Sequence, residues 1–156
     1  MKLQILGIAA SAALLAASAR PAAAQQHEQP IKYTVEMKAS NATPPVAGKA
    51  AGRATLTYEG HMVHYLVDVS DLSGPATMAH IHVGKLGISG PPVYTFEINK
   101  VGSGKLAEGD IDLSKAASKT VSGDSLKVLL NNGAAYINVH TAAHAGGEIR
   151  GQIVKE

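Results

Sequence analysis

Histidines alternate with aliphatic residues in two segments of this chain that are distant in the sequence. His80 and His82 flank an isoleucine, and His140 lies between a valine and a threonine. In a β-strand, residues i and i+2 project from one face about 6 to 7 Å apart, so two such imidazoles can bind one ion together. A third imidazole from a neighbouring strand would complete a nitrogen-rich set that suits copper or zinc better than calcium or magnesium. The spacing predicts a metal site, copper before zinc, with His80, His82 and His140 as ligands and His144 in the following turn as a fourth ligand or a cover.

Aliphatic residues alternate with these histidines in both segments, and each aliphatic set is predicted to face the core. The predicted inward residues are Ala79, Ile81 and Val83 in the first segment and Ala135, Ile137 and Val139 in the second. The opposite faces hold Met78 with His80 and His82, and Tyr136 and Asn138 with His140. The histidines can converge only if they lie on the same face of the sheet in both strands. That condition does not by itself make the two strands neighbours. The alternative interpretation is a set of solvated surface imidazoles without an ion.

The remaining histidines are less well supported as metal ligands, for the same geometric reason. His64 faces outward on the strand expected over 63–70, whereas His61 falls in the turn before it. Cleavage after Ala24 would make His27 the third residue, where an amine, two amides and an imidazole can bind Cu(II) or Ni(II) in a square plane.

Two charged residues near the end of the chain share one predicted strand face. Glu148 and Arg150 are two residues apart, and we expect an exposed pair of little energetic weight. In the functional alternative, Arg150 holds the turn before it or draws an anion toward the histidines.

The first 24 residues have the features of a secretory signal peptide. They carry a lysine at position 2, an apolar run over 3–17 and an Ala-Ala-Ala ending at Ala24. We expect cleavage near Ala24, export to the periplasm or the exterior, a flexible tail over 25–30 and one domain over 31–156. The apolar run is short for a spanning helix, and no later segment is apolar enough, so no membrane span is expected in the mature form.

Composition excludes several classes of protein. The chain has no cysteine, so disulfides and thiolate ligands are impossible. Lys2 and Arg20 account for the formal charge of +2, which leaves a neutral mature chain without the basic footprint of a nucleic-acid binder. We find no G-x-G-x-x-G, phosphate-loop or G-x-S-x-G motif, so nucleotide binding and elbow-type hydrolysis have no support.

Periodicity predicts an all-β antiparallel sandwich or barrel with one short helix. Leucines at 126, 129 and 130 have helical spacing, Ser122 or Asp124 is placed to begin the helix, and Asn131 to Gly133 to end it. Strands are expected over 31–38, 53–58, 63–70, 78–83, 93–98, 105–113, 135–141 and 148–154.

Three motifs in order resemble the CHRD domain, the module named after chordin. They are Ala79 to Gly84, Tyr136 to Thr141 and Gly147 to Ile153, and the resemblance extends from about Ile31 to Val154. It implies an immunoglobulin-like or superoxide-dismutase-like Greek-key sandwich, and it implies little about activity.

The chain is more distantly similar to copper-zinc superoxide dismutases. His80 and His82 match that family's H-x-H copper ligands, and His140 matches its late histidine. No histidine occurs between Val83 and Val139, so the ligand that would bridge copper to zinc is missing, as are a zinc set and the structural disulfide.

The leading hypothesis is therefore an exported, non-enzymatic binding protein with a copper site. The alternatives are a copper-dependent dismutase-like enzyme and a protein-interaction module that binds an extracytoplasmic partner without metal.

Overall fold

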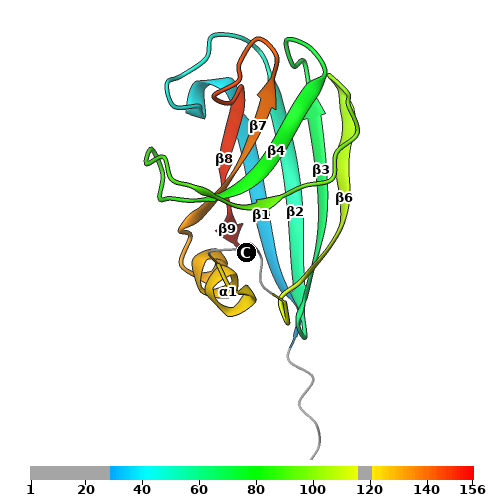
Figure 1. Cartoon of the computed structure of the whole chain (residues 1–156), viewed down its shortest axis with the longest axis vertical. Helices are drawn as coiled ribbons and strands as arrows, with labels where there is room; N and C mark the ends of the chain where they lie inside the picture. Colours follow the sequence, from blue (N-terminus) through cyan, green and yellow to red (C-terminus); the bar gives the residue numbers. More distant parts are fainter. Residues whose placement is uncertain (1–28, 116–120) are drawn as a thin grey trace, which may run out of the picture.

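The computed structural model describes residues 29–115 and 121–156 (Figure 1). The predicted signal peptide, the tail up to residue 28 and His27 lie outside these residues. The elements in chain order are β1 (Ile31–Lys38), the 3-10 helix η1 (Ala39–Asn41), β2 (Ala51–Glu59), β3 (Met62–Ser70), β4 (Ala76–Val83), β5 (Pro92–Thr95), β6 (Gly104–Asp112), α1 (Gly123–Asn131), β7 (Ala135–Thr141), β8 (Ile149–Gln152) and β9 (Val154–Lys155).

The strands form one antiparallel sheet that curls into two facing layers. Its order is β5-β4-β7-β8-β1-β2-β3-β6, with β9 pairing to β1. In Figure 1, β4 crosses diagonally in front of β2 and extends toward β3. Ring contacts join the two ends of the sheet, because Tyr65 of β3 packs edge-on against Tyr94 of β5 at 6.1 Å between ring centroids. The predicted all-β, sandwich-like fold is confirmed.

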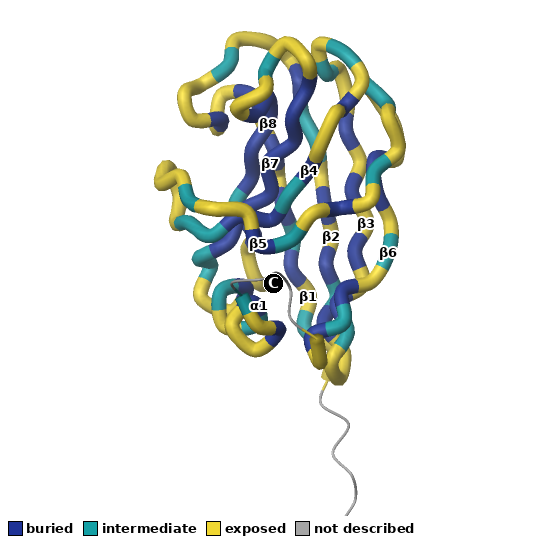
Figure 2. The backbone as a smooth tube through the Cα atoms, viewed as in Figure 1, coloured by how far each residue is buried: buried dark blue, intermediate teal, exposed yellow. Residues whose placement is uncertain are grey.

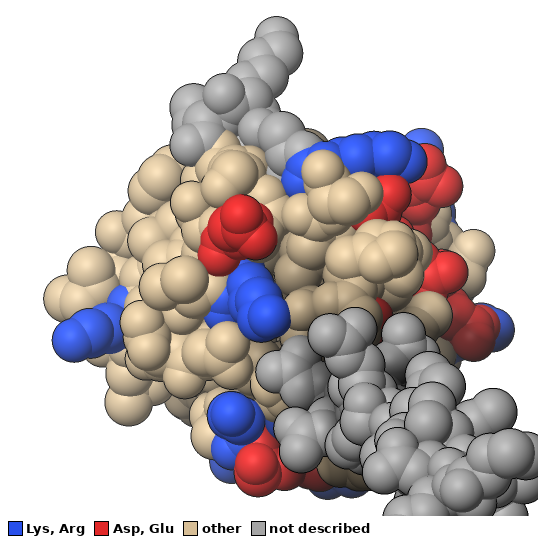
Figure 3. All heavy atoms as spheres, turned by 90° about the horizontal axis from the view of Figure 1, so that it is seen from below, with Lys and Arg blue, Asp and Glu red and all other residues tan. Residues whose placement is uncertain are grey.

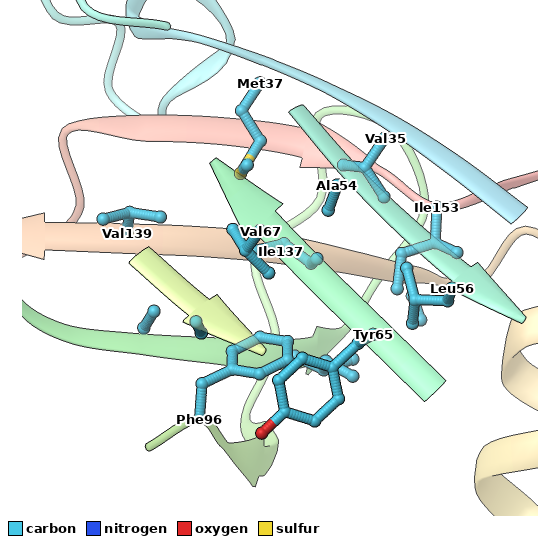
Figure 4. Packing of buried hydrophobic residues seen from close by; sticks show 14 of the residues in the cluster. Val35, Met37, Ala54, Leu56, Tyr65, Val67, Phe96, Ile137, Val139 and Ile153 are labelled. Atoms are coloured by element: carbon cyan, nitrogen blue, oxygen red, sulfur yellow. The ribbon is translucent and has the colours of Figure 1, made fainter. Parts of the chain in front are cut away.

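Alternation places one apolar face of every long strand in the space between the layers. Tyr33, Val35 and Met37 of β1 are each 1% exposed, as period-two burial requires. Tyr65 also meets Phe96, with ring centroids 4.9 Å apart, and Figure 4 shows these two rings side by side. The core is therefore continuous from the first strand to the segment after β5.

The α-helix α1 begins and ends where the sequence predicts. Ser122 is the N-cap, and its hydroxyl accepts a hydrogen bond from the Ser125 backbone N–H at 3.2 Å. Leu126 and Leu130 are buried, so one face of α1 packs against the core. None of the described helices is long and apolar enough to cross a membrane.

Two predicted strands differ most from the structure, while the others differ by no more than two residues at an end. The strand expected over 93–98 stops at Thr95, and Phe96 turns into the core. The strand expected over 148–154 is divided, because Ile153 bonds back to Ala135 while Val154 pairs with Thr34 of β1.

The outer faces of β7 and β8 are buried, although alternation alone predicts them exposed. Every residue of β7 is buried, and the tube in Figure 2 is dark along β7 and β8. The segment 84–91, between β4 and β5, covers these strands: Gly84 N–H donates to Ala134 O, and Gly90 N–H donates to the Tyr136 hydroxyl. This cover encloses the face that carries the histidines.

Elsewhere the surface mixes charges of both signs. On the end of the sandwich shown in Figure 3, acidic and basic side chains of the described residues are interspersed among uncharged ones. The described ion pairs are exposed, such as Arg53 with Glu36 at 2.7 Å, and contribute little to stability.

Candidate metal centre

Pairing of β4 with β7 brings the two histidine segments together. Met78 lies opposite His140, and His80 lies opposite Asn138, in an antiparallel register. Because β4 and β7 are adjacent and share the predicted parity, His80, His82 and His140 meet on the outer face. One nitrogen from each imidazole lies within 4.8 Å of the other two, so one ion could contact all three.

One ring nitrogen of His82 is held by a backbone carbonyl, and the other has no hydrogen-bond partner. Its Nδ1 is 2.9 Å from the carbonyl oxygen of Gly90, which can only accept, so Nδ1 carries the proton. Its Nε2 therefore keeps a lone pair in the neutral ring. That Nε2 is buried and has no hydrogen-bond partner. An unpaired buried acceptor costs about 1–3 kcal/mol, which a bound cation at this nitrogen would offset.

His140 is oriented in the same way by the other loop. Its Nδ1 is 2.8 Å from the carbonyl oxygen of Ala145, so the lone pair is again on Nε2. His80 Nδ1 lies 3.1 Å from His140 Nε2 and donates to it. A metal ion would replace this hydrogen bond, with His80 offering Nδ1 after a change of tautomer. Carbonyl partners behind metal-binding imidazoles are the usual second layer of such sites.

Electrostatics favour the neutral forms of His80 and His82. Burial lowers the pKa of His80, and the charges of His140 and His82 lower it further. Burial also lowers the pKa of His82 and outweighs the hydrogen bond to Gly90, while His140 and Arg150 lower it further. Neutral imidazoles are the form that binds metals.

A tyrosine and an arginine lie beside the histidines, on the side of the site that faces β8. The His82 ring stacks on Tyr136 at 5.0 Å and 15°, and the Arg150 guanidinium carbon lies 3.5 Å from the centroid of the Tyr136 ring. Tyr136 on β7 thus bridges the histidines of β4 and the arginine of β8.

The other predicted residues lie apart from this group. His144 is in the loop between β7 and β8, outside the three-histidine group, and its charge acts on Glu148. His64 pairs with Asp110 of β6. His61 is in the β2–β3 turn, where its carbonyl accepts from Leu113 N–H.

The prediction of an exposed pair between Glu148 and Arg150 is wrong. They are 2% and 3% exposed, and they have different partners. Glu148 accepts hydrogen bonds from Ser73 and Thr141, whereas Arg150 donates to Thr43, Lys85 and Ile88. The segment 84–91 folds over β8, and this long-range contact cannot be read from strand parity.

The sequence did not predict a role in the site for two backbone carbonyls and one tyrosine. Gly90 and Ala145 contribute only main-chain oxygens, which leave no mark in side-chain patterns. Tyr136 did carry a signal, since it shares the parity of His140.

A search of curated proteins gives no match for this chain. The family model of the CHRD domain matches residues 33–153, which span the sheet from β1 to the end of β8 and include all three histidines. The chain belongs to the CHRD-domain family.

Proposed function

We propose that this CHRD domain is an exported binding module that holds one copper ion. The ligands are His80 Nδ1, His82 Nε2 and His140 Nε2. The observation that carries the proposal is the Nε2 of His82, a lone pair that is buried without a partner and oriented by the Gly90 carbonyl. Family membership supports a binding module, and the three imidazoles supply the ligand chemistry.

Copper is favoured over zinc by a neighbouring thioether. Met78 lies on the same face of β4 as His80 and directly opposite His140 on β7. Residues opposite each other on antiparallel strands have Cβ atoms about 5 Å apart. Met78 is 48% exposed, so its side chain is free to turn toward the histidines. Thioether sulfur selects Cu(I), whereas zinc is satisfied by nitrogen.

Calorimetric titration of the purified, metal-free protein with copper and with zinc tests the proposal. The double variant His80→Ala/His82→Ala removes two ligands, and His61→Ala is the matched control because His61 lies in a distant turn. We expect one copper per chain, bound tighter than zinc, and lost only in the double variant. A His27→Ala variant separates the sheet site from an amino-terminal one. Binding that persists in the double variant, or none at all, would overturn the assignment.

A second candidate is a copper-dependent, dismutase-like enzyme. Three nitrogen ligands leave a coordination position open, and a cavity lined by His82 and His140 adjoins them. A xanthine-oxidase-coupled assay on the copper-loaded protein would show superoxide turnover that disappears in His82→Ala. Absence of turnover with intact copper binding would leave the binding role alone.

The third candidate is a protein-interaction module without metal. It predicts no stoichiometric metal and a partner interaction that is unaffected by the double variant.

A further inference from the structure

A cavity of about 190 Å³ adjoins the histidine group on its β8 side. Its lining includes His82, His140, Asn138, Ser89 and Arg150. A water molecule occupies about 30 Å³ of liquid, so the space suits an anion of a few non-hydrogen atoms. The cavity borders the metal position, because His82 and His140 line it, but it extends away from His80 toward Arg150, which also lines it.

Arg150 brings a formal positive charge to this cavity without a balancing carboxylate. It is 3% exposed, and no acidic side chain in the part of the chain that the structure describes lies within ion-pair distance of it. Its guanidinium donates to the Thr43 hydroxyl at 3.1 Å and to the carbonyls of Lys85 and Ile88 at 3.1 and 2.7 Å. These neutral oxygens satisfy three of five N–H groups, and together with the face of the Tyr136 ring they leave the guanidinium without an anionic partner. Buried charges are ordinarily paired.

The rest of the lining does not supply the missing negative charge. No aspartate or glutamate lines the cavity. Glu148 is near in sequence, but its carboxylate is held by Ser73 and Thr141.

We propose that this cavity binds a small carboxylate or inorganic oxyanion against the Arg150 guanidinium. A planar guanidinium with unused N–H donors is the group that recognises carboxylate and phosphate oxygens. Binding uses the charge of Arg150 and needs no metal ion. If the histidines held a metal ion, an anion in this cavity would lie next to two of its ligands, His82 and His140.

The test is an NMR titration of the chelator-treated, metal-free protein with sodium phosphate and, separately, sodium acetate at constant pH and ionic strength. We expect saturable shifts of the Arg150 side-chain N–H and of the Gly90 and Gly146 amides, since both glycines line the cavity. The acetate and phosphate arms distinguish a carboxylate from an inorganic oxyanion. Shifts that rise linearly, or that are spread over surface lysines, would overturn the proposal.

Ser89 provides the matched pair of variants. It is exposed and lines the cavity, so it can be replaced with little risk to folding. Ser89→Asp puts a competing carboxylate beside Arg150 and should weaken anion binding by at least about tenfold. Ser89→Asn has the same shape without the charge and should keep affinity within about twofold. Equal effects of the two variants would contradict a charge-driven site.

These experiments test the anion site and the metal site independently of each other. Anion binding is measured without metal, and metal binding is measured by calorimetry in a buffer without oxyanions or carboxylates. Metal binding without anion shifts would refute the cavity proposal alone, and the reverse result would refute the histidine proposal alone.

Discussion

At the residue scale, the site depends on which nitrogen of each imidazole carries a proton. Gly90 and Ala145 fix that choice for His82 and His140, because a carbonyl oxygen accepts only. His80 is held instead by another imidazole, so it is the ligand whose proton must move when an ion binds.

Replacing Met78 by leucine tests the metal preference. Met78→Leu keeps the size and apolar character of the side chain but removes the sulfur. We expect Cu(I) affinity to fall about tenfold and Zn(II) affinity to change less than about twofold, because thioether sulfur is a soft ligand that suits Cu(I), whereas Zn(II) is already well held by imidazole nitrogen. Competition with a chromogenic chelator measures both constants. An equal loss for both ions would place Met78 outside the coordination sphere.

The lowered pKa values of His80 and His82 make the metal-free protein sensitive to acid. The unfolded chain takes up protons near pH 6.5, whereas the folded protein takes them up only at lower pH. The free energy of unfolding should therefore fall as pH drops below about 6.5, since the unfolded state then binds more protons. Urea denaturation at pH 7.5, 6.5 and 5.5 measures this slope. The His80→Ala/His82→Ala variant should have a shallower slope, and an unchanged one would contradict the assignment.

At the element scale, the segment 84–91 decides the environment of the outer face. It approaches β4 so closely that a Cβ at Gly90 would lie 2.0 Å from the Val83 carbonyl oxygen. Only glycine permits this approach, and the approach places the Gly90 oxygen on His82.

Gly90→Ala should therefore displace the segment and release His82. We expect a loss of stability of about 1–3 kcal/mol from the steric overlap, together with weaker metal binding. Thermal unfolding and calorimetry measure the two effects. Gly74→Ala is the control, because a Cβ there meets nothing within 4 Å and should change stability by less than about 0.5 kcal/mol.

Glu148, just before the start of β8, ties the β7–β8 loop to the loop between β3 and β4 through Ser73. Burial raises its pKa, but hydrogen bonds from Thr141 and Ser73 outweigh burial and leave the pKa below its ordinary value. Glu148→Gln would set an amide N–H₂ against these donors and should cost about 1–3 kcal/mol near neutral pH. Chemical denaturation measures the loss, with the exposed Glu108→Gln as control.

The effect of Glu148→Gln should depend on pH. A carboxylate with a lowered pKa stabilises the fold above its ordinary pKa of 4.5, and this contribution is lost as pH falls through the folded value. The difference between the two proteins should therefore shrink below pH 4.5, and a constant difference would exclude the ionised carboxylate as its cause.

At the scale of the whole molecule, the candidate site joins strands that are far apart in the chain. The ligands come from β4 and β7, and their covers come from the segment 84–91 and the β7–β8 loop. A ligand that binds only this folded arrangement must raise the stability of the entire domain.

Copper at one hundred times its dissociation constant should stabilise the protein by about 2.7 kcal/mol. Differential scanning calorimetry with and without copper measures the shift of the unfolding temperature. The His80→Ala/His82→Ala variant should show none, whereas His61→Ala should behave like the parent. A shift that survives in the double variant would mean that copper binds elsewhere.

The sequence by itself determined the local features of this protein. Alternation identified β1, the β2–β3 hairpin and the aliphatic faces of β4 and β7, because the direction of a strand side chain depends only on its parity. Ser122 and the leucines of α1 identified the helix, since capping and helical spacing are also local. The same alternation predicted that His80, His82 and His140 lie on the outward faces of their strands.

The tertiary structure alone decided whether those faces meet and what covers them. Adjacency of β4 and β7 depends on pairing between residues more than 50 apart in the chain, such as Met78 and His140. Burial of Arg150 and the proton positions on His82 and His140 depend on main-chain oxygens of two loops. Backbone carbonyls are the same in every residue, so no side-chain pattern specifies which of them will reach a given imidazole.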